Sequence, residues 1–209
     1  MRPEPGQVLH FSEDPTITVF KPHVARTARE PDPYVWAVTW SRAPDYWFPR
    51  QCPRAMAWTA PWTTAEDARA FLGPGSAEGV QGVRGAEGVQ GAGGVEGAEG
   101  AEHAQGVQRV HAVEYGWLDA MREATLYAYR FAAEDFQPIG DPKSPHAMVS
   151  DHEVAPLAPP ERVGDLFALH DEAGIELRVL PNLWPFWDGV IASTLDFSGI
   201  RLHNARPRP

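Results

Sequence analysis

The chain has 209 residues, of which 43% are hydrophobic and 11% aromatic, as in a globular protein with a sizeable core. Its formal net charge of −10 argues against general binding to nucleic-acid backbones. The single cysteine, Cys52, excludes an intramolecular disulfide and a multi-cysteine zinc site. No apolar run reaches the roughly 18 residues of a membrane helix, and the first residues do not resemble a signal peptide. We therefore expect a soluble, cytoplasmic protein with no membrane partner.

Residues 74–106 have the composition of an insertion. Glycine recurs with a strict three-residue period at 79, 82, 85, 88, 91, 94, 97 and 100. A collagen helix needs proline as well, and the stretch has none after Pro74. We predict a flexible, acidic, low-complexity loop within a single domain that spans 1–209.

The part before the insertion predicts two strands and a helix. Gln7–Phe11 is a candidate strand, and Thr16–Phe20 is a short β-branched segment. Tyr34–Trp40 alternates, so that Tyr34, Trp36, Val38 and Trp40 share one face. A helix begins after Thr64, with acidic residues in its first turn, and stops at Gly73.

The part after the insertion alternates strands and helices. The expected strands or edges are Val107–Tyr115, Leu126–Phe131, Ala147–Ser150, Val154–Leu157 and Ile175–Leu180. The expected helices are Trp117–Glu123, Pro160–Ala173 and one that begins at Pro185. About six strands and four helices without strict βαβ order predict an α+β fold with a mixed or split sheet.

Several common catalytic patterns are absent from the sequence. It has no phosphate-binding glycine loop between a strand and a helix, no Gly-x-Ser-x-Gly and no His-Glu-x-x-His. Cys52 lies between Arg50 and Arg54, which would stabilise an exposed thiolate, although a lone cysteine is more often a buried, inert thiol. We favour the inert thiol.

The histidines near residue 150 do not predict a metal site. His146, His152 and Glu153 have suitable ligand atoms, but neighbouring residues on a strand point to opposite faces. We therefore expect no metal. His170 lies three residues after Phe167 on the apolar stripe of its helix, and we predict a packed core histidine.

His10 and Ser12 are the first candidates for a ligand site, because residues two apart on a strand share a face. His10 either bonds a backbone carbonyl in a half-buried strand or donates into a cleft. Tyr34 and Trp36 either belong to the core or stack on a planar ligand. Glu153 is either a solvated surface carboxylate or the acidic group of the same cleft.

Outside the insertion, nearly the whole chain resembles a small bacterial family, a domain of unknown function. The resemblance is carried by six segments, Leu9–Glu13, Val35–Val38, Pro49–Arg54, Leu126–Phe131, Leu177–Pro185 and Phe197–Ala205. It implies no established activity.

A second resemblance concerns mechanism. A histidine in the first strand, an aromatic strand and a late glutamate are similar to the order of motifs in ADP-ribosyltransferase-like folds of the His-Tyr-Glu type. That resemblance implies NAD as the cofactor, with His10 on the ribose, Tyr34 or Trp36 on the nicotinamide, and Glu153 stabilising an oxocarbenium-like transition state. Arg50 and Arg54 either bind the pyrophosphate, since guanidinium groups pair with phosphate oxygens, or form surface salt bridges with the many acidic residues.

The leading hypothesis is thus a protein that binds NAD or a related nucleotide on an ADP-ribosyltransferase-like core. Its catalytic residues would be Glu153 and His10. The residues expected around the cofactor are His10, Ser12, Tyr34, Trp36, Arg50 and Arg54. A catalytic protein would cleave the bond between nicotinamide and ribose. The alternatives are a non-catalytic small-molecule-binding module and a protein-docking module that uses the aromatic residues Trp184, Phe186 and Trp187.

Overall fold

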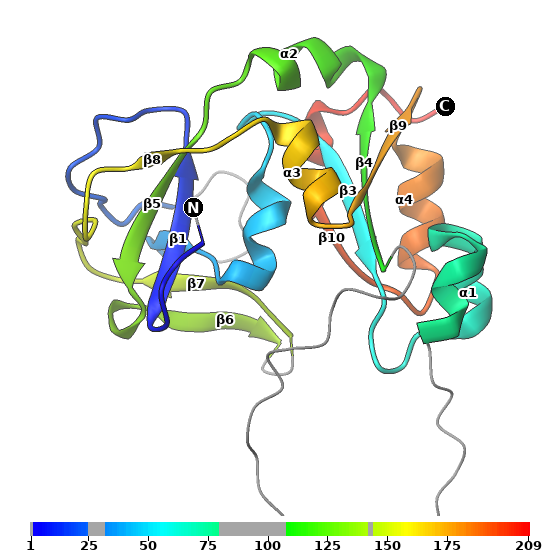
Figure 1. The fold of residues 1–209 in the computed structure, drawn as a ribbon, viewed down its shortest axis with the longest axis horizontal. Coiled ribbons are helices and arrows are strands. Elements are labelled where there is room, and N and C mark those ends of the chain that lie inside the picture. Colours follow the sequence, from blue (N-terminus) through cyan, green and yellow to red (C-terminus); the bar gives the residue numbers. More distant parts are fainter. Residues whose placement is uncertain (1, 25–31, 80–107, 142–143) are drawn as a thin grey trace, which may run out of the picture.

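The computed structural model describes residues 2–24, 32–79, 108–141 and 144–209. These residues form two halves with a short 3-10 helix between them, η1 (Trp40–Tyr46), seen as light-blue turns at the centre of Figure 1. One half consists of two small sheets, and the other of a four-stranded sheet with helices on both faces.

The first half contains two three-stranded sheets that meet at one point. In the first, β1 (Gln7–Ser12) pairs with β5 (Tyr127–Ala132), which also pairs with β8 (Glu161–Arg162). In the second, β7 (Ser144–Ser150) lies between β2 (Val35–Ala37) and β6 (Gln137–Asp141). Leu9 and Val38 exchange two backbone hydrogen bonds of 2.8 Å, which join the sheets.

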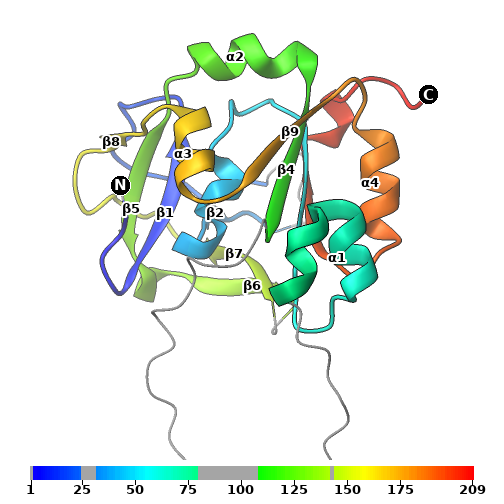
Figure 2. The ribbon, with the colours of Figure 1, turned by 45° about the vertical axis from the view of Figure 1, so that its right-hand side comes forward.

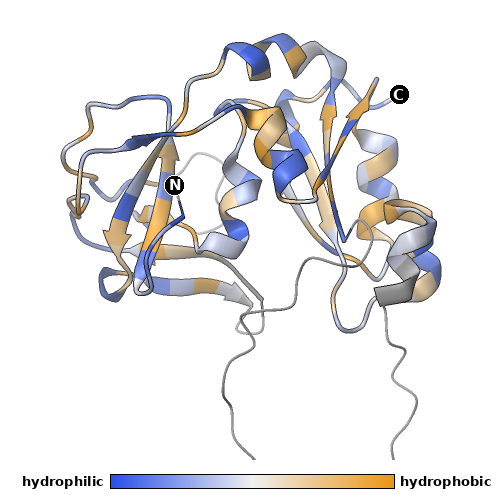
Figure 3. Ribbon diagram, viewed as in Figure 1, coloured by the Kyte–Doolittle hydropathy of each residue, from blue (hydrophilic) through white to orange (hydrophobic). Residues whose placement is uncertain are grey.

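The core of the first half follows from the period of two along its strands. Tyr129 and Phe131 on β5 are fully buried, and Val8 on β1 lies in the same cluster with Val35 and Ala37 on β2. Hydrophobic residues concentrate along β1, β4 and β9 in Figure 3. The predicted face of β5 is therefore confirmed.

The second half is a four-stranded sheet in the order β10-β3-β4-β9. Its strands are β10 (Asp196–Ile200), β3 (Arg54–Trp58), β4 (Arg109–Glu114) and β9 (Glu176–Leu180). Only the β4–β9 pair is parallel among these strands. The sheet is thus mixed, as predicted.

Helices cover both faces of this sheet. On the outer face, α1 (Ala65–Leu72) and α4 (Trp184–Ile191) pack against Ala57 and Val110 (Figure 2). On the inner face lie α2 (Leu118–Glu123) and α3 (Leu166–Glu172). The inner face turns toward the first half (Figure 1), and two of its side chains, Arg54 and Arg109, form hydrogen bonds with Asp45 of η1.

The α+β class and the four α-helices of the described residues agree with prediction, but the described strands number ten instead of about six. The missed strands include β3, β6 and β10. β3 has the sequence Arg-Ala-Met-Ala-Trp and is covered on both faces, so it lacks the alternation of a half-exposed strand.

Three predicted segments differ in detail. Thr16–Phe20 and Val154–Leu157 contribute only a bridge between Phe20 and Val154. The strand predicted over Tyr34–Trp40 ends at Ala37, and η1 begins at Trp40. The helix predicted from Pro160 begins at Leu166, because the carboxylate of Asp165 accepts hydrogen bonds from the amides of Phe167 and Ala168.

Part of the predicted insertion is ordered in this structure. Pro74–Gly79 form a 3-10 helix, η2, in which the buried Ser76 hydroxyl donates to the carbonyl of Ala68 over 2.8 Å. The prediction for residues 80–106 lies outside the described residues. Within the described ranges, no helix is both long and apolar enough to cross a membrane.

Candidate functional site

The inner face of β3 and β4 carries polar side chains where a core would normally be apolar. Arg54 and Trp58 on β3 share this face with Arg109 and His111 on β4, because residues two apart on a strand point the same way. In the register, Trp58 lies opposite Arg109. These four side chains face η1 across the middle of the molecule.

Asp45 on η1 is the buried acidic group at this contact. Its carboxylate accepts a hydrogen bond from Nη2 of Arg109 and lies 3.6 Å from Nη1 of Arg42. Its backbone oxygen accepts from Nε of Arg54 over 2.7 Å. Burial raises the pKa of Asp45, and the three arginines oppose that rise. One carboxylate thus lies among three guanidinium groups.

Two of these arginines line a pocket of about 470 Å³ between the halves of the molecule. Both are held against one aromatic ring, with Cζ of Arg42 at 4.4 Å and Cζ of Arg109 at 4.7 Å from the centre of the Trp58 ring. The pocket is lined by Thr39, Ser41, Arg42, Trp58, Arg109, Ala147 and Met148. It therefore combines guanidinium and hydroxyl donors with an apolar wall.

A chain of hydrogen bonds runs inward from the pocket through two histidines. Nε of Arg109 lies 2.8 Å from Nε2 of His111, and Nδ1 of His111 lies 3.0 Å from Nε2 of His170. Nδ1 of His170 lies 2.6 Å from the carbonyl oxygen of Leu166. The chain ends at this backbone oxygen in α3.

The two ends of this chain determine the tautomers. The carbonyl of Leu166 can only accept, so His170 carries its proton on Nδ1 and accepts at Nε2. Nε of Arg109 can only donate, so His111 accepts at Nε2 and donates from Nδ1 to His170. Both imidazoles are thus neutral, and each nitrogen has a partner.

The environment of the histidines favours the same neutral state. The pKa of His170 is lowered to about 4, mainly by burial; the Leu166 hydrogen bond opposes this shift, and the Arg109 and Arg54 guanidinium groups contribute to it. Burial lowers the pKa of His111 well below its usual value, with Arg109 and His170 acting in the same direction. The prediction that His170 is a packed core histidine is confirmed by its 1% exposure.

The structure places His10 in the first half, and it is not among the described residues that line the pocket. Its Nδ1 donates to the carbonyl of Trp36 over 2.7 Å, and its ring meets that of Phe20 at 4.9 Å between centres. The pKa of His10 is lowered to about 4, mainly by burial; the Trp36 hydrogen bond opposes this shift, and nearby Arg50 contributes to it. The simpler of the two predicted roles, a bond to a backbone carbonyl, is present.

The other residues predicted beside His10 have local roles. Ser12 is buried, and its hydroxyl accepts from the amide of Asp14 over 3.1 Å. The rings of Tyr34 and Trp36 meet edge to face with 6.2 Å between centres. Neither ring lines the pocket described above.

Glu153 is at the surface of the first half. Its side chain is 56% exposed and pairs with Nζ of Lys21 over 3.1 Å. The next residue, Val154, points inward and bonds the backbone of Phe20, whose ring contacts His10. No described contact joins Glu153 to His10, and their common site stays a prediction.

The two arginines predicted for a pyrophosphate lie in different surroundings. Arg50 is exposed, and its backbone amide donates to the carboxylate of Glu13 over 2.9 Å. Arg54 is buried in the cluster around Asp45, where Nη1 donates to the carbonyl of Cys52 over 3.0 Å. The guanidinium of Arg54 thus holds protein backbone.

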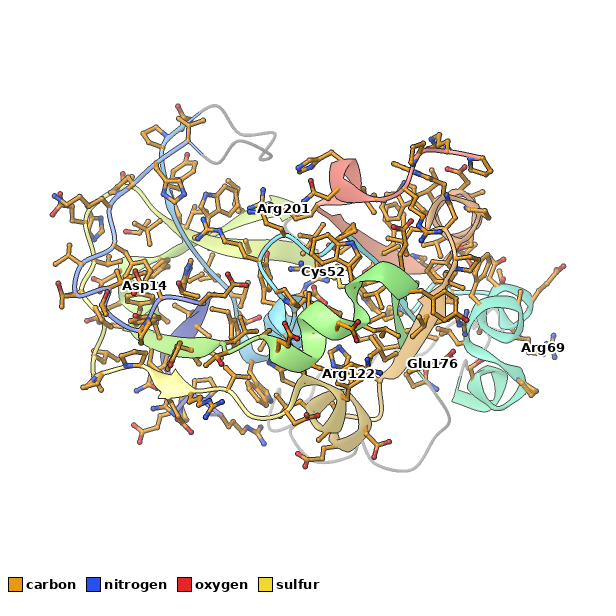
Figure 4. All side chains as sticks on the ribbon, turned by 90° about the horizontal axis from the view of Figure 1, so that it is seen from above. Asp14, Cys52, Arg69, Arg122, Glu176 and Arg201 are labelled. Atoms are coloured by element: carbon orange, nitrogen blue, oxygen red, sulfur yellow. The ribbon has the colours of Figure 1, made fainter. Side chains whose placement is uncertain are left out.

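Cys52 lies in the middle of the molecule (Figure 4) and is fully buried. Burial raises the pKa of its thiol to about 12, although Arg54 is nearby. The favoured prediction, an inert thiol, agrees with this position. In the described part of the chain, no three His, Cys, Asp or Glu residues form a group able to hold a metal ion.

The sequence model of a family of unknown function, DUF6886, matches residues 9–86 and 96–205. The chain belongs to this family. The predicted resemblance to a domain of unknown function is therefore confirmed. No curated protein and no solved structure matches the chain, so the ADP-ribosyltransferase-like core stays a prediction.

The sequence analysis missed the residues of the pocket. Arg42 and Asp45 come after the predicted strand Tyr34–Trp40, and Trp58 is in a strand that the sequence pattern does not predict. The available signal was the pair Arg42 and Asp45, three apart beside Pro44, within an otherwise apolar and aromatic segment. Such a pair is typical of a charge that is buried with its partner.

Proposed function

We propose that this protein binds a small organic anion in the pocket between its two halves. The observation that carries the proposal is the pair of guanidinium groups, Arg42 and Arg109, in the wall of one pocket. This corresponds to the small-molecule-binding alternative of the sequence analysis, and its ligand class includes the predicted nucleotides.

The chemistry of the wall supports an anion. Guanidinium groups recognise phosphate and carboxylate through paired, charge-assisted hydrogen bonds. Asp45 and Trp58 hold the two groups in place, so that little side-chain freedom is left to lose on binding. Among the described residues that line the pocket, none is acidic.

The size of the pocket supports an organic molecule. Its volume of about 470 Å³ is within the range of small-molecule sites and exceeds what an inorganic anion needs. Trp58, Ala147 and Met148 provide apolar surface next to the arginines. A ligand with an anionic group and an apolar or planar part suits both walls.

The docking alternative receives less support. Trp184, Phe186 and Trp187 are half-buried, and the C-terminal residues cover Trp184, whose Nε1 donates to the carbonyl of Arg206 over 2.7 Å. The ADP-ribosyltransferase-type reaction at His10 and Glu153 is a separate hypothesis, and the last prediction below tests it.

Isothermal titration and thermal-shift assays with AMP, NAD and phenyl phosphate test the proposal. Thr39→Trp places a large ring at an exposed position of the pocket wall, and we expect it to abolish binding. Arg42→Gln should weaken binding at least tenfold, since a hydrogen bond to a charged group is worth about 1.5–3 kcal/mol.

Arg178→Gln is the matched control. Arg178 is also a half-buried arginine that pairs with an acid, Glu176, and lies over an aromatic ring, Phe186, but it does not line the pocket. Its substitution should leave binding unchanged. Equal binding by the wild type and Thr39→Trp would contradict the proposed function.

A further inference from the structure

The hydrogen bonds of Arg109 show which of its donors face inward. A guanidinium group has five N–H groups. Three of them donate to protein atoms. Nε donates to Nε2 of His111, Nη2 donates to the carboxylate of Asp45, and Nη1 donates to the carbonyl of Ser41 over 3.1 Å. Two N–H groups, one on each terminal nitrogen, have no acceptor among the described residues.

The inward hydrogen bonds fix the orientation of the group. His111 and Asp45 bind Nε and Nη2, which form one edge of the guanidinium plane, and Nε2 of His111 lies 3.6 Å from the carboxylate of Asp45. His170 in turn holds His111. The guanidinium group of Arg109 is therefore held in a fixed orientation, and Asp45, His111 and His170 act as positioning residues.

Two hydroxyl groups belong to residues that line the same pocket as Arg109. The oxygens of Thr39 and Ser41 are 3.0 Å apart, so one hydroxyl donates to the other and one hydroxyl proton is left for a further acceptor. Ser41 is tied to Arg109 through its own carbonyl oxygen. The pocket wall thus offers at least three N–H or O–H donors from Arg109, Thr39 and Ser41, with the Arg42 guanidinium next to them.

We infer that the anionic group of the ligand is a terminal phosphate, so that the ligand is a phosphomonoester with an organic part against Trp58 and Met148. This inference rests on the proposed function and names its ligand class. A terminal phosphate has three free oxygens and two negative charges, which match three donors and two guanidinium groups. A carboxylate has two oxygens, and each phosphate of a dinucleotide such as NAD has only two free oxygens.

Matched probes separate these classes. Phenyl phosphate and benzoate share the ring and differ in the anion, while AMP and NAD share the adenosine and differ in the phosphate. At fixed ionic strength and pH 7.5, we expect phenyl phosphate to bind at least tenfold more tightly than benzoate, and AMP at least tenfold more tightly than NAD.

A double variant tests the assigned donors. Thr39→Val with Ser41→Ala removes both hydroxyl groups at exposed positions and keeps the backbone carbonyl that Arg109 uses. It should reduce the affinity for phenyl phosphate several-fold and leave that for benzoate nearly unchanged. The ratio of the affinity for phenyl phosphate to that for benzoate should therefore decrease.

The outcomes distinguish the two proposals. The phosphomonoester inference would be overturned if benzoate bound as tightly as phenyl phosphate, or NAD as tightly as AMP. The proposed function would still hold if Thr39→Trp abolished that binding. A preference for phosphate that the double variant does not change would also overturn the inference. Binding by none of the probes would overturn both.

Discussion

Nδ1 of His111 donates to Nε2 of His170 across 3.0 Å in the interior between the four-stranded sheet and α3. The bond has one direction, because Arg109 occupies the other nitrogen of His111 and Leu166 occupies the other nitrogen of His170. A proton added to either ring would break one of these bonds. The pair therefore couples the position of Arg109 to the neutral state of two imidazoles.

Acid should destabilise the fold through these histidines. An unfolded histidine titrates near pH 6.5, whereas His170 in the fold titrates at about 4, so the unfolded state binds more protons between these values. Stability is then full above pH 6.5 and falls as the pH decreases toward 4. His111 and His10, whose pKa values are also lowered, add to the fall, and Asp45 opposes it because its pKa is raised in the fold.

Urea unfolding at pH 7 and pH 5 measures this effect. His170 alone should lower the free energy of unfolding by about 2 kcal/mol between these two values. A free energy of unfolding that is constant or rises toward pH 5 would contradict the neutral assignment of the histidine pair.

Replacing His170 should leave a buried donor without a partner. In His170→Phe, Nδ1 of His111 loses its acceptor, and we expect a loss of about 1–3 kcal/mol in the free energy of unfolding at pH 7. The exposed His203 provides the control, since His203→Phe should change stability by less than about 0.5 kcal/mol. Equal effects of the two substitutions would show that the His111 bond contributes nothing.

Cys52 should not react in the folded protein. Its thiol is fully buried with a pKa of about 12, so almost no thiolate is present at pH 8. We expect iodoacetamide to modify it only after unfolding in urea, as mass spectrometry would show. Rapid modification of the native protein would return Cys52 to the candidates for a nucleophile.

Features that depend on residues close together in the sequence could be predicted, and contacts between residues far apart in the sequence could not. The alternation of Tyr127, Tyr129 and Phe131 predicts a strand whose aromatic side chains share a face in the core, and this is confirmed, because the pattern depends on neighbours two apart. The pocket instead depends on which strands pair. Trp58 and Arg109 are opposite each other only because β3 and β4 are adjacent across the insertion.

The same limit applies to the ligand site. His10 is a candidate because it is a histidine within a strand, but a strand pattern alone does not distinguish a hydrogen bond to a carbonyl from one to a ligand. Arg109 could be recognised as part of a site only through its hydrogen bond to Asp45, which is 64 positions away in the sequence. Contacts of this kind follow from the tertiary fold and not from local spacing.

The ADP-ribosyltransferase-type hypothesis and the pocket proposal differ in which substitutions should abolish the rise in Tm that NAD causes. A ligand at about a hundred times its dissociation constant adds roughly 2.7 kcal/mol, or on the order of 5–10 °C in Tm for a chain of this size. We expect any rise with NAD to persist in His10→Ala and Glu153→Gln and to vanish in Thr39→Trp, each compared with its own ligand-free Tm.

We expect this result because the surroundings of His10 and Glu153 are less suited to an anion than the pocket is. His10 is neutral and spends Nδ1 on a backbone carbonyl, and Glu153 is paired with Lys21 at the surface, whereas the pocket holds two guanidinium groups in fixed positions. A rise that vanishes in His10→Ala and persists in Thr39→Trp would reverse this expectation. It would locate the nucleotide at His10, support the ADP-ribosyltransferase-type hypothesis, and make the release of nicotinamide the next quantity to measure.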